Sequence, residues 1–187
     1  MTPTLVVTGL PGVGKSTLCS MLSDELGCLS LNTGEVLRNH LRDNGVNLRD
    51  EISTGDVFVE RFGKSHVGDV IADAAVATNA YILDGVRLIS ILPALTARGR
   101  IPSVIYLTVP EEIRRDRFIS RTHAEGVTEL ITAQKLMSDK DRWAGDLDAF
   151  RDLSRWQFEN AGAMIRLQSF AKAVAFDIKR VPITSVT

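Results

Sequence analysis

Residues Gly9-Leu10-Pro11-Gly12-Val13-Gly14-Lys15-Ser16-Thr17 fit the pattern G-x-x-x-x-G-K-[ST], and this stretch decides the fold. Before it lies the apolar run Leu5–Thr8, which predicts a fully buried strand. After it lies Lys15–Leu26, which predicts an amphipathic helix that ends at Gly27. A glycine-rich turn between a buried strand and a helix is the setting in which this pattern binds phosphate. The alternative interpretation is a strand-to-helix turn that binds nothing.

The residue types within this loop suit a bound triphosphate. Gly12 and Gly14 allow backbone conformations that turn successive amide N–H groups inward around an anion. Lys15 can reach the outer phosphates, and the Ser16 hydroxyl can bind a magnesium ion that bridges phosphate oxygens. We therefore expect ATP and Mg2+ as cofactors. The residues expected to bind the donor nucleotide are Gly9, Pro11, Gly12, Val13, Gly14, Lys15, Ser16 and Thr17.

Strand-like and helix-like segments alternate along the whole chain of 187 residues, without internal repeats. This alternation predicts a single domain, residues 1–187, with the three-layer α/β/α fold of P-loop NTPases and about five parallel strands. Further strands are expected at Cys28–Leu31, 79–83, 101–109 and Ala163–Leu167. Helices are expected at 34–42, 66–78, 88–97, 110–121 and 170–180, with a longer helical region at 128–158 that Gly145 interrupts.

The charge balance narrows the class of partner. Lys and Arg total 22 against 23 for Asp and Glu, so no strong overall field draws the chain onto nucleic acid or an anionic membrane. The apolar run near the N-terminus is too short for a signal peptide or a membrane span. We therefore expect a cytoplasmic protein, a monomer or homodimer, whose partner is a small nucleotide. Cys19 and Cys28 lie in apolar segments and are expected to be small core residues.

The rest of the sequence narrows the class of nucleotide-binding protein. A GTPase would need an Asn-Lys-x-Asp segment to read the base, and the sequence contains none. Its only Asp-x-x-Gly, at Asp24–Gly27, ends the first expected helix, where it could not sense a third phosphate. A transporter-type ATPase would need a longer chain and a Ser-Gly-Gly signature, which is also missing. Small kinases and nucleotide-binding regulatory proteins remain.

Three further segments resemble the nucleoside monophosphate kinase family, which includes adenylate kinase. Asn32–Arg38 resembles that family's segment after the second strand, and Leu83–Arg87 resembles its Asp-Gly-x-x-Arg segment. Val109–Glu112, followed by Arg117 and Arg121, resembles the helix that leads into its mobile lid. The resemblance extends from about Leu5 to Arg121 and implies an acceptor-binding insertion at about 33–79 and a short lid at about 121–128.

The resemblance implies that Thr33 and Gly34 lie near the acceptor base and that Arg38 holds the acceptor phosphate. The chemistry is consistent with this, because ligands of open parallel sheets bind beyond the carboxyl ends of the strands. Asp84 would help Ser16 to hold magnesium, while guanidinium groups grip a phosphate in two-pronged fashion. The expected acceptor-binding residues are Thr33, Gly34, Arg38, Asp84 and Arg87, and the expected metal-binding residues are Ser16 and Asp84.

The arginines of the lid helix are also candidates. Arg114, Arg117 and Arg121 follow the spacing i, i+3 and i+7, so they share one helix face that could cover the transferring phosphoryl group. The alternative is an ordinary solvated charged face. The expected catalytic residues are Lys15, Asp84, Arg87, Arg117 and Arg121.

These features predict a phosphotransferase that moves the γ-phosphate of ATP to a nucleoside monophosphate or similar small nucleotide. The Asp-Gly-Val-Arg form of residues 84–87 also resembles dephospho-coenzyme A kinase-like proteins, whose acceptor is a sugar hydroxyl. Such an acceptor would need a base, for which Asp56 and Glu35 are candidates. A third hypothesis is a non-catalytic regulatory protein that binds nucleotide. We also expect Leu167–Phe170, after the last expected strand, to lie along the adenine.

Overall fold

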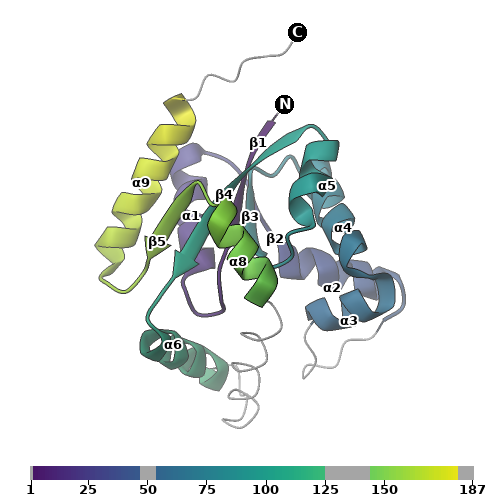
Figure 1. The fold of residues 1–187 in the computed structure, drawn as a ribbon, viewed down its shortest axis with the longest axis horizontal. Helices are drawn as coiled ribbons and strands as arrows, with labels where there is room; N and C mark the ends of the chain where they lie inside the picture. The colour runs from purple at the N-terminus through teal and green to yellow at the C-terminus, as the bar shows by residue number, and fades with distance from the viewer. Residues whose placement is uncertain (1, 47–53, 125–143, 181–187) are drawn as a thin grey trace.

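The computed structural model describes residues 2–46, 54–124 and 144–180, and they form a central sheet between two layers of helices (Figure 1). The sheet has five strands in the order β2-β3-β1-β4-β5, and every neighbouring pair is parallel. The strands are β1 (Thr2–Thr8), β2 (Ser30–Asn32), β3 (Ile82–Val86), β4 (Arg100–Thr108) and β5 (Trp156–Glu159). The predicted three-layer parallel fold is therefore confirmed.

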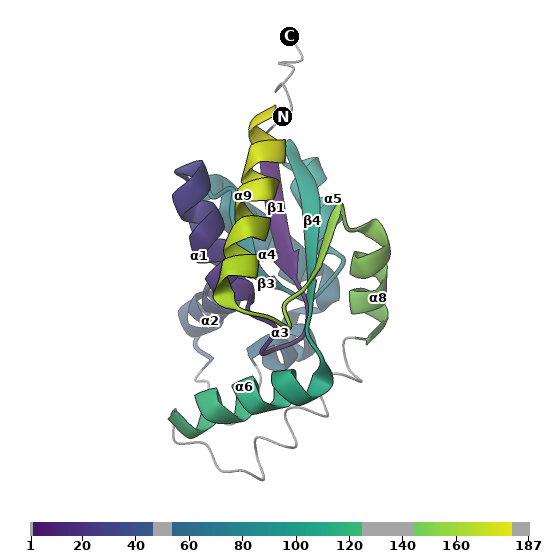
Figure 2. The same ribbon diagram turned by 90° about the vertical axis from the view of Figure 1, so that its left-hand side faces the viewer.

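Helices cover both faces of this sheet, as the βαβ connections of a parallel sheet require. On one face lie α1 (Lys15–Leu26) and α9 (Met164–Arg180). On the other lie α2 (Thr33–Asp43), α3 (Thr54–Phe62), α4 (Lys64–Ala77), α5 (Ile91–Ala97) and α8 (Ala144–Leu153). The remaining helix described, α6 (Glu111–Ala124), crosses below the end of the sheet at which the strand arrows finish (Figure 2). This end carries the phosphate-binding motif.

Two hydrophobic cores lie on opposite faces of the sheet, and successive side chains of the central strand β1 alternate between them. Leu5 and Val7 pack into the layer of α1 and α9, whereas Val6 packs into the layer of α2, α4 and α5. Because side chains alternate between the faces of a strand, a strand covered on both faces has to be apolar at successive positions. Residues 4–8 are all buried, as predicted for the first strand. No helix among the described residues is long and apolar enough to cross a membrane.

The predicted last strand is wrong. Ala163 directly precedes helix α9, and the other residues of the predicted strand Ala163–Leu167 form the first turn of that helix. The last described strand is β5, which begins at Trp156, in a region that was predicted to be helical. Trp156 and Phe158 are partly buried while Gln157 and Glu159 are exposed, which is the period of two expected of a half-buried strand. Leu167–Phe170 therefore lies inside a helix, where its amides bond within the helix, and cannot run along an adenine as predicted.

Other differences are smaller. Helix α3 falls in a polar stretch that the sequence pattern did not assign, and α5 begins at Ile91 instead of 88. Gly145 lies in the first turn of α8, and the residues before Ala144 lie outside the described part of the chain, so the predicted interruption is not tested. Cys19 is buried as predicted, but Cys28 is only partly buried. The predicted region 128–143 lies outside the described residues, as does the second half of the predicted lid at 121–128, whereas residues 121–124 continue helix α6.

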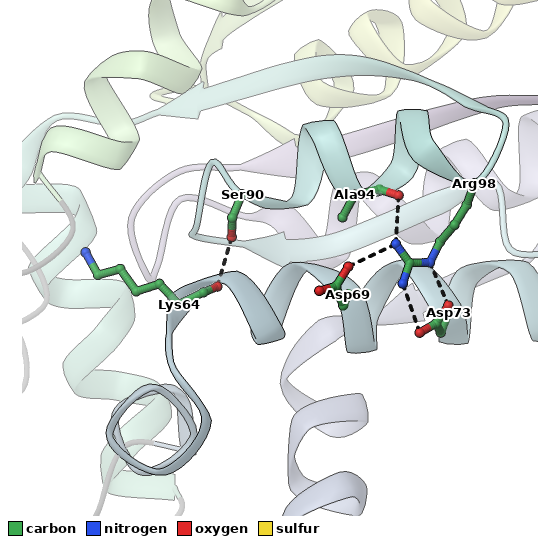
Figure 3. A network of polar contacts seen from close by, with 6 residues as sticks. All are labelled: Lys64, Asp69, Asp73, Ser90, Ala94 and Arg98. Atoms are coloured by element: carbon green, nitrogen blue, oxygen red, sulfur yellow. Dashed lines mark hydrogen bonds and ion pairs between the residues drawn. The ribbon is translucent and has the colours of Figure 1, made fainter.

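A guanidinium clamp joins helix α4 to the end of α5 (Figure 3). Arg98, which ends α5, donates two hydrogen bonds to Asp73, at 2.6 and 3.0 Å, and one of 3.0 Å to Asp69. The same side chain also bonds the main-chain O of Ala94. Both aspartates belong to α4, so the two helices are tied along their length.

Candidate functional site

The phosphate-binding loop depends on three glycines with positive φ. Gly9, Gly12 and Gly14 have φ values of 134°, 86° and 95°, a region in which side chains are disfavoured. Space is equally restrictive at the first of them, because a Cβ on Gly9 would collide with the main-chain O of Leu107 in β4. Glycine at these positions is therefore required both by the backbone conformation and by its neighbours.

Two later segments of the chain press against the back of the loop. A Cβ on Gly12 would lie 2.9 Å from the main-chain O of Arg114, and a Cβ on Gly14 would lie 2.5 Å from Nδ2 of Asn160. The Asn160 amide also donates a hydrogen bond of 2.9 Å to the main-chain O of Val13. Helix α6 and the end of β5 thus shape the loop from outside.

Lys15 lies over the loop that it follows. Its Nζ donates to the main-chain O of Gly9 and of Leu10, at 2.9 Å each. Helix α1 begins here, and its N-cap residue is Gly14, which has no side chain to cap the first-turn amides. A helix N-terminus of this kind offers N–H groups and a positive dipole end to an anion. Ser16 and Thr17 are exposed at the same point.

A β-bulge lies at the carboxyl end of β3, beside the end of β1 that leads into this loop. The pairing of β1 with β3 is regular up to Asp84, and Thr8 then pairs with Val86, which leaves Gly85 as the extra residue, with φ of 82°. Two hydroxyls close the bulge: Thr8 donates to the main-chain O of Val86 at 2.6 Å, and Thr33 donates to that of Asp84 at 2.9 Å. Thr33 is therefore bonded to the main chain of the site.

The Asp84 carboxylate lies against the first turns of α1. The Asp84 residue is 7% exposed, and its charge acts on the Cys19 thiol, which lies one turn after Lys15. Burial raises the pKa of the Cys19 thiol well above its ordinary value, and the Asp84 charge raises that pKa further, so this thiol stays protonated. Cys19 is therefore a buried, protonated thiol beside Asp84.

A magnesium ion fits the oxygen donors on this side of the loop. Among the described residues no group of three or more His, Cys, Asp or Glu side chains is placed to hold a metal ion. Mg2+ differs from most metals in needing only one or two protein oxygens, because phosphates and waters complete its shell. A carboxylate at Asp84 and a hydroxyl at Ser16 are donors of the kind that such an ion takes.

Three of the residues expected from the sequence to bind the acceptor, Thr33, Gly34 and Arg38, follow the strand β2. Asn32 caps helix α2 by accepting a hydrogen bond of 3.0 Å from the main-chain N of Glu35. A Cβ on Gly34 would lie 3.5 Å from Nη1 of Arg38, so the Arg38 guanidinium folds back over the first turn of α2. Gly34 and Arg38 are thus together at the carboxyl end of β2, beside Asp84 on β3.

Arg87 is partly buried and begins the loop between β3 and α5. This loop is fixed from two sides: Asp146 of α8 accepts a hydrogen bond of 3.0 Å from the main-chain N of Ile89 and lies 3.8 Å from Nζ of Lys64. The Ser90 hydroxyl bonds the main-chain O of Lys64 at the start of α4 (Figure 3). The backbone that carries Arg87 is therefore held in place.

The three arginines of α6 differ in their surroundings. Arg114 is buried, ion-paired with Glu111 at 2.6 Å, and its Nη1 lies 3.5 Å from the main-chain O of Pro11. Arg117 is partly buried on the same helix face. Arg121 belongs to α6, but its side chain lies outside the described residues. A plain solvated face, the alternative interpretation, is wrong for Arg114.

Two residues that shape the site, Asn160 and Asp146, were missed from the sequence, and Arg114 was named as a candidate without its contact with the loop. Asn160 follows a strand that was assigned to a helix, although the alternation of Trp156 and Phe158 with polar residues marked that strand. Asp146 sits in the first turn of α8, where an acid is commonplace. No local pattern distinguishes these residues from ordinary polar ones.

Comparison with known proteins identifies the family of this chain. The family model described as AAA domain matches residues 8–131, which include the loop, the bulge at Gly85 and most of the described site. The chain belongs to the AAA domain family. This AAA domain protein is 29% identical over 131 residues to an adenylate kinase of Micrococcus luteus, a match that covers 65% of this chain and 63% of the relative.

Other matches extend over more of the AAA domain protein. It is 27% identical to an adenylate kinase of Prochlorococcus marinus over 186 residues, which cover 94% of this chain and 96% of the relative. A solved shikimate kinase of Bacteroides thetaiotaomicron superposes with a TM-score of 0.60 at 12% identity, covering 95% of this chain and 98% of that one. The last likeness concerns the fold alone. The predicted resemblance to adenylate kinases is confirmed.

Proposed function

We propose that this protein transfers the γ-phosphate of ATP to a nucleoside monophosphate or a similar small nucleotide. The observation that carries the proposal is the convergence of donor-side and acceptor-side groups at Gly85. A Cβ on this residue would lie 3.7 Å from Oγ1 of Thr33 and 4.0 Å from Cε of Lys15. The phosphate loop follows β1 and the acceptor helix follows β2, and these two strands flank β3, so both segments approach Gly85 at the end of β3. Direct transfer between two bound nucleotides requires donor and acceptor groups to be this close.

On the donor side, the chain supplies positive groups and no nucleophile. When the triphosphate binds, Lys15 Nζ would give up its hydrogen bonds to the main-chain O of Gly9 and of Leu10 and donate to phosphate oxygens instead. The first-turn amides of α1 would face the same triphosphate. Magnesium, when bound, neutralises charge on the phosphate oxygens, and Ser16 and Asp84 are the residues that would hold it. Phosphoryl transfer needs alignment and charge neutralisation above all, which these residues provide.

On the acceptor side, Arg38 and Arg87 are proposed to grip the acceptor phosphate. A guanidinium presents parallel N–H donors that match two phosphate oxygens, which a lysine cannot do. Arg117 on α6 would add positive charge where the transferring group is most negative. Thr33 and Gly34 would lie near the acceptor base, with the Thr33 hydroxyl anchored to Asp84.

The relatives support this activity without establishing it. Two of them are named adenylate kinase, and the chain spans 63% of the length of one and 96% of the other. At 27–29% identity a change of acceptor is compatible with the same loop chemistry. ATP as donor, magnesium as its counterion and the nucleotide acceptor are therefore parts of the proposal.

The deciding experiment offers the purified protein ATP and magnesium with a panel of acceptors: nucleoside monophosphates, dephospho-coenzyme A and phosphorylated sugars. ADP formation and the phosphorylated acceptor are both measured by chromatography. The Lys15→Ala variant should lose transfer, whereas Lys172→Ala, which removes an exposed lysine of α9, should retain it.

The outcomes separate the hypotheses. Transfer to one or more monophosphates supports the proposal, and transfer only to dephospho-coenzyme A or a sugar hydroxyl would replace it with a metabolite kinase. Tight ATP binding without transfer to any acceptor would favour a regulatory nucleotide-binding protein. Full activity of the Lys15→Ala variant would show that the phosphate loop is not the donor site.

A further inference from the structure

Arg114 is the most deeply buried charged side chain of the described residues, at 2% exposure. A guanidinium stays charged at any pH at which the protein folds, so its burial requires close polar partners. Glu111, one turn earlier, accepts two hydrogen bonds from it, at 2.9 Å from Nε and 2.6 Å from Nη2. The pair has the two-pronged geometry that only arginine can form with a carboxylate.

The third contact of this guanidinium reaches the phosphate-binding loop. Nη1 of Arg114 points to the main-chain O of Pro11 at 3.5 Å, across 103 residues of sequence. The stem of the same side chain packs against the next residue, since a Cβ on Gly12 would lie 3.3 Å from Cγ of Arg114 and 2.9 Å from its main-chain O. The first turn of α6 and the back of the loop therefore form one packed unit.

The position of Arg114 on α6 adds a functional consequence. Arg117 lies three residues later on the same helix face and is partly buried. A contact that fixes the first turn of α6 against the loop also fixes where Arg117 stands relative to phosphates held by the loop. An error of about 1 Å in such an alignment can reduce a transfer rate by roughly 100-fold.

We propose that Arg114 is a positioning residue, which, braced by Glu111, fastens the root of α6 to the phosphate-binding loop and so sets the geometry of both the donor phosphates and Arg117. This inference rests on the proposed phosphotransferase function. Arg114 itself does not touch the nucleotide in this role, and it acts through the main chain of Pro11 and Gly12.

The test compares Arg114→Lys, Arg114→Met and Glu111→Gln with wild-type protein and with Arg115→Gln, an exposed neighbour on α6. Three quantities are measured well below each melting temperature: the Kd for ATP without acceptor, the KM for each substrate, and kcat. We expect Arg114→Lys and Arg114→Met to weaken ATP binding by about tenfold and to lower kcat by roughly 10- to 100-fold. The acceptor KM should change by less than about twofold.

Glu111→Gln keeps one acceptor oxygen and should give a smaller change in the same direction, and Arg115→Gln should behave as wild type. Variants with a lowered melting temperature but wild-type Kd and kcat would reduce Arg114 to a stabilising residue and overturn the proposal. Restoration of wild-type kinetics by Arg114→Lys would do the same, because it would remove the need for two-pronged geometry. If one variant does not fold, the other two decide.

The ATP titration separates this proposal from the proposed function. Wild-type protein that binds ATP but phosphorylates no acceptor would refute the function, while a weaker Kd in the Arg114 variants would still support the positioning role toward the loop. Equal Kd values for wild type and variants would refute that role whether or not the protein turns over.

Discussion

The side-chain amide of Asn160 donates to the main-chain O of Val13 across 147 residues of sequence, at 2.9 Å. Asn160 is buried and follows the last strand, whereas Val13 is the centre of the phosphate-binding loop. An unpaired buried carbonyl costs free energy, so this bond holds the loop to the far edge of the sheet. The sheet and the loop are thereby joined at a point distant from the sequence motif.

We predict that Asn160→Ala lowers the free energy of unfolding by about 1–3 kcal/mol and weakens ATP binding, because the Val13 carbonyl loses its donor. Chemical denaturation and calorimetric titration with ATP measure the two effects. The control is Asn44→Ala, which removes an exposed bond to the main-chain O of His40 at the end of α2. Equal ATP affinity in the two variants would contradict the prediction.

Gly12→Ala is expected to abolish measurable ATP binding. The new methyl group would combine a φ of 86° with a contact 2.9 Å from the main-chain O of Arg114, so either the loop or α6 has to move. Gly27→Ala is the matched control, since its φ of 64° is also left-handed but open space surrounds it. That control should lose only roughly 1–2 kcal/mol of stability and keep its ATP affinity.

The same substitution in two helices should have opposite effects. A Cβ on Gly68 of α4 would lie 2.7 Å from the main-chain O of Ser90, so Gly68→Ala should displace the loop that carries Arg87 and destabilise the protein by about 1–3 kcal/mol. Gly145→Ala in α8 meets nothing within 4 Å and should stabilise by roughly 0.5 kcal/mol.

Steady-state kinetics give this pair a second readout. Gly68→Ala should raise the KM for the acceptor more than the KM for ATP, because Ser90 lies on the same loop as Arg87, which is proposed to grip the acceptor phosphate. Parallel increases in both constants would show that the displacement reaches the donor loop as well.

The Arg98 clamp predicts a stability difference that disappears in acid. Hydrogen bonds from Arg98 lower the pKa of Asp73 from its ordinary value. A carboxylate with a lowered pKa in the folded state stabilises the fold above its ordinary pKa, and this contribution is lost as the pH falls through the lowered value. Wild-type protein should therefore exceed Asp73→Asn in stability at pH 7.

Urea unfolding at pH 7 and near pH 2.5 measures this difference. The gap between wild type and Asp73→Asn should narrow at the lower pH, because the contribution of Asp73 is lost as the pH falls below the ordinary pKa of an aspartate and through the lowered pKa. Asp24→Asn, at an exposed position of α1, serves as the control and should leave the unfolding midpoint nearly unchanged at neutral pH. A constant gap at both pH values would show that Asp73 acts without its charge.

The fold followed from the sequence because its signals are local. The glycine-rich loop, the buried run at Leu5–Thr8 and the acid-rich start of α6 each specify their own segment, and β1, α1, α2 and α4 lie close to where they were predicted. Strand β5 did not follow, since four residues give only two periods of alternation, and the apolar spacing from Met164 onward was taken for a strand instead of the start of α9.

The supports of the site are not local, and no pattern in the sequence indicates them. The bond from Asn160 to Val13 joins residues 147 apart, the contact from Arg114 to Pro11 spans 103, and the bond between Ile89 and Asp146 spans 57. A sequence shows that a residue can donate or accept, but only the packed chain determines its partner. Residues proposed to contact ligand could therefore be named as candidates from the sequence, whereas the residues that hold them in place could not.

Each glycine of the phosphate-binding loop is backed by a residue from a much later part of the chain: Leu107, Arg114 and Asn160. During synthesis the motif therefore leaves the ribosome well before the three residues that pack against it. A nascent chain that ends before Asn160 would contain every residue of the motif but would lack the side chain that packs against Gly14 and bonds the main-chain O of Val13. The proposed binding of nucleotide would then be linked to the folding of the whole described fold, so that a nucleotide bound at this loop would stabilise the folded protein globally.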